Sequence, residues 1–204
     1  MRRSNVMKYK FLLIPTCFIL LASFAANTLP KTFTDLLSRA DMLFESPDSV
    51  VSAPIIYSHA MSYEYAIKYP GKNFEVRYAV RPSDNLWSEY EAHSKNLKKG
   101  DVNTNPDSTY MAAFQTIILN VSGGLPNITE FDKASVKSEF NADWGGTVAV
   151  QPRKEFGQNY KYCMIIALHK NKKGDAYVFF LSDSTEGFNQ KVAPVLHSLM
   201  FNNF

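Results

Sequence analysis

The chain has 204 residues, of which 46% are apolar and 20% charged, and its formal net charge is +3. Residues 1–25 hold four basic residues and no acidic ones, so the rest of the chain carries 18 Lys and Arg against 19 Asp and Glu, a formal charge of −1. A nearly neutral domain offers no general electrostatic basis for binding nucleic acid or an anionic membrane, and we expect no nucleic-acid partner.

The first 25 residues have the layout of a secretory signal peptide. A cationic start precedes an almost unbroken apolar run from Phe11 to Phe24, and Ser23 and Ala25 are the small residues that a signal peptidase reads. The run has 14 residues and contains Pro15, whereas a membrane-spanning helix needs roughly 20 apolar residues. We expect cleavage after Ala25, a periplasmic or secreted location and no stable membrane span afterwards. An uncleaved anchor is the alternative.

Cysteine use agrees with an exported domain that has no disulfide. Cys17 follows Ile14-Pro15-Thr16, a poor context for a lipid-anchored cysteine, and it leaves with the signal peptide. Cys163 then has no partner for an internal disulfide. Residues 26–204 are long enough to bury a core without a disulfide, so we expect a single globular domain.

The first predicted elements are a helix and a β-hairpin. Apolar residues at helical spacing predict a helix over 32–45, ended by Pro47. Alternating residues then predict strands at 61–69 and 74–81, joined by the loop 70–73. With this loop, Ile67 should face Val76, and the apolar side chains should share one face. The other face should hold Lys68 opposite Glu75, with Glu64 diagonal to Arg77 and Arg81.

The middle of the chain reads as an irregular segment, a helix and two short strands. Residues 82–106 are polar and without clear periodicity. Asp107 could cap a helix running to about Val121, which Gly123 would stop. Short strands are predicted over 134–140 and 146–151.

The last third predicts a second hairpin and a terminal helix. Tyr160–His169 and Asp175–Leu181 are apolar on both sides, which is typical of strands buried on both faces. From about residue 185 an amphipathic helix is expected, with a kink or a late start at Pro194.

These elements predict an α+β fold: a largely antiparallel sheet covered by helices on both faces, an α/β/α sandwich. The order of a strand pair, a polar excursion, a helix and antiparallel strands ending in Tyr177-Val178-Phe179-Phe180, followed by an amphipathic helix, resembles the Mog1/PsbP-like domains over about residues 50–201. The resemblance implies a non-catalytic binding or assembly module and supplies no catalytic residue.

No motif identifies a reaction. Cys163 and His169 share a strand face, but six residues of strand separate them by about 20 Å. The histidines lack metal-ligand spacing, and we expect no metal site and no cofactor. Alternating oxygen ligands at 101–107 resemble a calcium loop without its Gly and Glu, so capping by Asp107 is favoured over an opportunistic cation.

The best candidate cluster is Glu139, Asn141, Asp143 and Trp144. A carboxylate beside an indole in a turn could bind a polar ligand or have a raised pKa, although turn chemistry and core packing also account for these residues. We expect an exported, non-catalytic module that binds an unknown protein or small ligand, or that supports an envelope assembly. The alternative is an exported hydrolase or ligand-modifying enzyme that uses this cluster.

Overall fold

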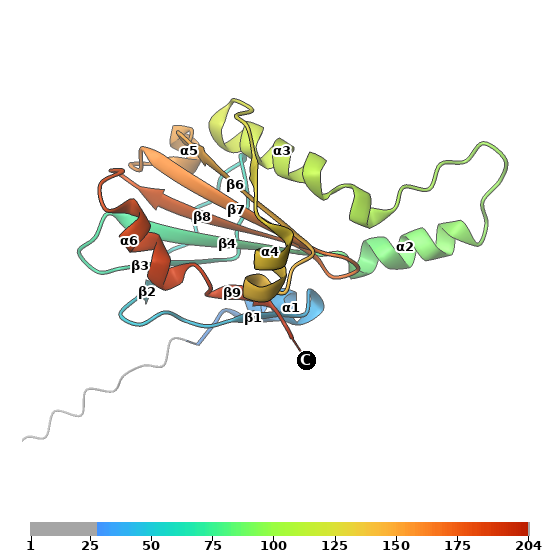
Figure 1. The fold of residues 1–204 in the computed structure, drawn as a ribbon, viewed down its shortest axis with the longest axis horizontal. Helices are drawn as coiled ribbons and strands as arrows, with labels where there is room; N and C mark the ends of the chain where they lie inside the picture. Colours follow the sequence, from blue (N-terminus) through green and yellow to red (C-terminus); the bar gives the residue numbers. More distant parts are fainter. Residues whose placement is uncertain (1–27, 204) are drawn as a thin grey trace, which may run out of the picture.

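The computed structural model describes residues 28–203, so the predicted signal peptide lies outside the described residues. A seven-stranded antiparallel sheet with strand order β2-β3-β4-β8-β7-β6-β5 forms its centre, and β1 pairs with β9 in a second, two-stranded sheet (Figure 1). The strands are β1 Met42–Phe44, β2 Val51–Ser52, β3 Tyr65–Lys68, β4 Phe74–Pro82, β5 Thr129–Glu130, β6 Trp144–Val150, β7 Tyr162–Lys170, β8 Gly174–Ser182 and β9 Leu199–Phe201. The prediction of an α+β chain with a large antiparallel sheet is therefore confirmed.

The helices lie between and around these strands. They are α1 Lys31–Arg39, α2 Asp84–Ser94, α3 Tyr110–Ser122, α4 Lys133–Phe140, α5 Lys154–Gly157 and α6 Phe188–Val192, with 3₁₀ turns η1 Pro106–Ser108 and η2 Ala193–Val195. Within the described residues, no helix has both the length and the apolar character needed to cross a membrane.

Both predicted hairpins are present, and their registers follow the alternation of the sequence. Ile67 faces Val76 and Lys68 faces Glu75, as expected. Glu64 bonds to Arg81, whose Nη1 lies 2.9 Å from a carboxylate oxygen. In the second hairpin, Gly174 begins β8 with φ +130°, and a Cβ there would lie 2.1 Å from the Arg81 carbonyl oxygen. Only glycine fits this turn without moving β4.

The central strands separate two hydrophobic clusters. On β4 and β8, alternate side chains such as Val76 and Phe180 enter the first cluster, and the intervening Ala79 and Phe179 enter the second. Buried residues of α1, α4 and α6 belong to the first cluster, and those of α3 belong to the second. The prediction that the second hairpin is buried on both faces is confirmed.

Several predicted elements are wrong in type or in extent. The predicted helix 32–45 ends at Arg39, because Asp41 has a left-handed φ of +54° and residues 42–44 pair with β9 instead. The predicted strand 134–140 is α4, whose N-terminus is capped by Asp132 accepting from Ser135 N at 2.9 Å. The terminal helix stops early, and Leu199 lies in β9. Pro194 lies where the α-helix changes to a 3₁₀ turn.

Residues 82–106, predicted to be irregular, contain α2. We call residues 84–109 the arm, because α2 and the loop after it extend away from the sheet (Figure 1). None of the eleven residues of α2 is buried, so the helix receives little support from packing. Asp107 does not cap α3, whose N-cap is Thr109. Instead its carboxylate accepts from Lys172 N at 3.0 Å and from Trp87 Nε1 at 3.2 Å, joining the arm to the β7–β8 turn.

Candidate functional site

The residues predicted from the sequence as a ligand site contact different parts of the molecule. Glu139, at the end of α4, lies 3.0 Å from Nε2 of His197. Asn141 adopts a left-handed φ of +49° after α4 and donates from Nδ2 to the carbonyl oxygen of Asn202. Both side chains therefore hold the C-terminal segment against α4.

Asp143 and Trp144 face the β7–β8 turn and α3. Asp143 accepts from Asn171 N at 3.0 Å and lies 3.4 Å from Nζ of Lys137. The Trp144 ring packs 4.9 Å from the Tyr110 ring, and its buried Nε1 has no hydrogen-bond partner among the described residues. The structure thus brings Asp143 to the turn and Trp144 to the helix, and it does not bring the four side chains into one cavity.

Cys163 and His169 lie at opposite ends of β7, as their spacing predicts. Cys163 is fully buried, and burial raises the pKa of its thiol to about 12, with Arg77 opposing the shift. The thiolate required of a nucleophile is therefore scarce at neutral pH.

His169 is buried against the Tyr110 ring, with ring centroids 4.4 Å apart. Its Nδ1 lies 2.7 Å from Asp175 Oδ1 and its Nε2 lies 3.3 Å from Asn171 Oδ1. Burial lowers the pKa of His169, but the hydrogen bond and the charge of Asp175 oppose this effect, and the pKa is raised overall. Both ring nitrogens are occupied, so the histidine holds the turn rather than facing a substrate.

The described residues hold no group of three or more His, Cys, Asp or Glu side chains placed to bind a metal ion. The polar residues at 101–107 point to separate partners. Asp101 accepts from Lys98 N at 2.8 Å, Asn103 donates to Tyr90 O at 3.0 Å, and Asn105 accepts from Asp107 N at 2.9 Å. Their alternation therefore builds the loop of the arm.

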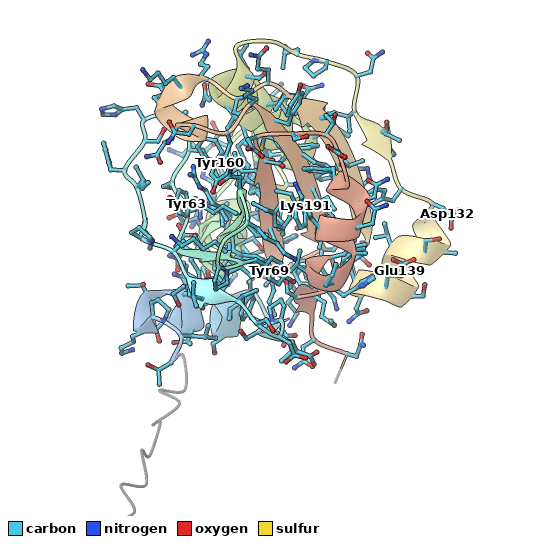
Figure 2. All side chains as sticks on the ribbon, turned by 90° about the vertical axis from the view of Figure 1, so that its left-hand side faces the viewer. Tyr63, Tyr69, Asp132, Glu139, Tyr160 and Lys191 are labelled. Atoms are coloured by element: carbon cyan, nitrogen blue, oxygen red, sulfur yellow. The ribbon has the colours of Figure 1, made fainter. Side chains whose placement is uncertain are left out.

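A different set of residues encloses a hollow at the other end of the central strands. The hollow has a volume of about 320 Å³ and is lined by Asn73, Glu75, Gln158, Asn159, Tyr160 and Asp183. These residues come from the start of β4, the turn before β7 and the end of β8. We call it the Glu75 hollow. Figure 2 shows Tyr160 and Glu139 on opposite sides of the strands, and none of residues 139–144 lines the hollow.

A buried ion pair forms one wall of the Glu75 hollow. Arg77 is 1% exposed and Glu75 is 8% exposed, and Arg77 Nε donates to Glu75 Oε1 at 2.6 Å. The guanidinium lies over the rings of Tyr63 and Phe156, 4.9 Å from each centroid, and donates from Nη1 to the Phe156 carbonyl. Its Nη2 has no hydrogen-bond partner within the described part of the chain. The rings and the carbonyl therefore hold Arg77 in place, and Arg77 holds Glu75.

The second oxygen of Glu75 turns toward Tyr160. The Tyr160 hydroxyl donates to Glu75 Oε2 at 3.4 Å, which is long for a hydrogen bond between oxygens. Burial and the Glu75 carboxylate raise the pKa of Tyr160 to about 12, and Asp183 adds to the rise while Arg77 opposes it. Asp183 accepts from Asn73 Nδ2 at 2.8 Å. Two carboxylates thus act on one hydroxyl at the edge of the hollow.

Sequence reasoning did not identify the Glu75 hollow. The alternation of β4 placed Glu75 and Arg77 on a common face, but that face read as the polar side of a hairpin. One feature of the sequence could have indicated a buried ion pair. Arg77 has no acidic residue opposite it in the hairpin, because Ala66 faces it and Glu64 pairs with Arg81.

Comparison of the chain with models of protein families, with curated proteins and with solved structures found no match.

Proposed function

We propose that this protein is an exported, non-catalytic module that binds a small ligand in the Glu75 hollow. The observation that carries the proposal is the buried Arg77–Glu75 ion pair at the wall of a hollow that is lined by polar side chains. Burying an ion pair costs desolvation energy that hydrophobic residues of the same size would avoid. The cost of burying this pair is explained if the carboxylate that it holds at the edge of the hollow contacts a ligand.

The contacts of the other candidate groups favour binding over hydrolysis. Cys163 is buried with a raised pKa, and both nitrogens of His169 are occupied. The alternative enzyme would need Glu139 and Asp143 to meet at a substrate, yet they contact His197 and Asn171, respectively.

We also propose the finer fold description, an α/β/α sandwich that resembles the Mog1/PsbP-like domains. The buried residues of α1 and α4 in one cluster and of α3 in the other support helices on both faces of the sheet. A fold carries no function by itself, but the non-catalytic character of that family agrees with the proposal.

Two measurements test the proposed function. The mass of the secreted protein should correspond to a chain that begins at Ala26, and retention of residues 1–25 would contradict cleavage after Ala25. Native mass spectrometry should detect a small molecule that co-purifies with the protein and is released chemically unchanged when the protein unfolds. In the Asn159→Trp variant, an exposed lining residue becomes bulky, and the added mass should disappear. Conversion of the molecule during incubation, or an added mass that the variant keeps, would refute the proposal.

A further inference from the structure

The lining of the Glu75 hollow is acidic and contains no basic side chain. Two carboxylates, three side-chain amides and one phenol surround it. Arg77 approaches Glu75 from the protein interior and is not among the lining residues. The two lining carboxylates and Arg77 together carry a formal charge of −1, which favours a cationic ligand.

The hollow also offers more acceptors than donors. Each carboxylate can accept about four hydrogen bonds. Glu75 Oε2 receives one long bond from Tyr160, and Asp183 receives one bond, from the Nδ2 of Asn73. The donors of the lining itself are its three side-chain amides and the Tyr160 hydroxyl. A ligand that fits these groups must therefore supply N–H donors.

The size and the ligand number argue against a bare metal ion. Calcium takes six to eight oxygen ligands, usually with several carboxylates, and one of the two carboxylates here is already paired with Arg77. A volume of about 320 Å³ instead suits an organic molecule of a few non-hydrogen atoms. The aromatic side chain of Tyr160 in the lining is compatible with an organic cation as well.

We infer that the Glu75 hollow binds a small organic cation, a primary ammonium or a guanidinium group, between the carboxylates of Glu75 and Asp183. The inference rests on the proposed function and specifies its ligand class. Arg77 acts here as a positioning residue, since it fixes the Glu75 carboxylate and does not line the hollow itself.

The test compares putrescine with 1,4-butanediol, a neutral molecule of the same length, in ¹⁵N-detected NMR titrations of the purified protein. Putrescine should shift the side-chain amide signals of Asn73 and Asn159 saturably, and butanediol should not. Asp183→Asn keeps the size of the side chain and should weaken putrescine binding at least about fivefold, as expected for loss of a charge-assisted hydrogen bond. Asp48→Asn, which removes an exposed carboxylate elsewhere, should leave the affinity unchanged.

Three outcomes would overturn the inference: equal binding of butanediol, putrescine affinity that Asp183→Asn does not change, or no shift with putrescine at millimolar concentration. Glucose is titrated in parallel. Shifts with glucose alone would exclude a cation while supporting the binding module. A co-purifying mass that Asn159→Trp does not remove would instead contradict the proposed function itself.

Discussion

The two ends of the β7–β8 hairpin use buried polar residues in opposite ways. At the turn, His169 bonds to Asp175 and Asn171, and the Asp107 carboxylate accepts from the Lys172 amide. At the open end, Glu75 is held by one short bond from Arg77 and one long bond from Tyr160.

This difference separates a structural use of polar groups from a binding use. The hydrogen bonds of His169, Asp175 and Asp107 at the turn all go to other groups of the protein, so their burial serves the attachment of the arm and α3. Groups at the open end retain acceptor capacity beside a hollow. A buried polar cluster is therefore a better guide to a binding site when its hydrogen bonding is incomplete than when it is complete.

The largest expected effect comes from breaking the ion pair at the open end. Arg77→Met leaves the Glu75 carboxylate buried without its partner, and should lower the free energy of unfolding by about 3–5 kcal/mol. Urea denaturation at pH 7 measures the change. The double variant Arg77→Met/Glu75→Leu should recover most of the loss. A cost of the single variant below about 1 kcal/mol would mean that Glu75 reaches water through the hollow.

At the turn, Asp175→Asn should remove stability that depends on pH. The folded-state pKa of His169 lies above its ordinary value of 6.5. Its protonation therefore stabilises the fold fully below pH 6.5, and this contribution is lost as pH rises through the folded-state pKa. The variant should cost about 1–2 kcal/mol at pH 6, with a smaller cost at pH 8. Unfolding curves between pH 6 and pH 8 measure it.

The matched control for that variant is Glu139→Gln, which alters the exposed pair between Glu139 and His197. The control should leave the pH dependence of unfolding as in the wild type. If both variants reduced the pH dependence of unfolding equally, His169 would not be the source of that dependence.

A smaller effect is expected where the arm joins the turn. Asp107→Ala removes the acceptor for Lys172 N and Trp87 Nε1, and should cost about 1 kcal/mol. Hydrogen exchange should accelerate in α2, because that helix has no buried residue to hold it. Asp101→Ala, which removes a bond to Lys98 N within the same arm, should leave α2 exchange nearly unchanged. Equal acceleration by both variants would place the anchor elsewhere.

Local patterns in the sequence predicted much of the sheet but not the pairing of distant segments. The alternation of β3 with β4 and of β7 with β8 specified both hairpins, because each register depends on a short loop. The pairing of β1 with β9 joins residues 42–44 to 199–201, and their own sequences read as helix ends. For α4, capping by Asp132 and the spacing of Val136 and Phe140 were present but were interpreted as a strand.

The four residues of the predicted site contact different parts of the molecule for a related reason. Residues 139–144 are neighbours in sequence, yet a helix end and a strand start send their side chains in different directions. The lining of the Glu75 hollow comes from three segments, 73–75, 158–160 and 183, which meet because β4 pairs with β8 and β8 with β7. Both hairpins were predicted, but their mutual pairing was not, and the site depends on that pairing.

The smallest effect tests how much spare capacity the open end retains. Tyr160→Phe removes a hydroxyl whose bond to Glu75 Oε2 is 3.4 Å long, and should change stability by less than about 0.5 kcal/mol. Tyr78→Phe removes a buried hydroxyl 2.8 Å from Ser198 Oγ and should cost about 1–1.5 kcal/mol in the same denaturation assay. If Glu75 Oε2 serves a cationic ligand, Tyr160→Phe should also leave putrescine affinity equal or higher, since it frees that oxygen. A large loss of stability without a change in affinity would show that Tyr160 and Glu75 form a closed pair like those at the turn.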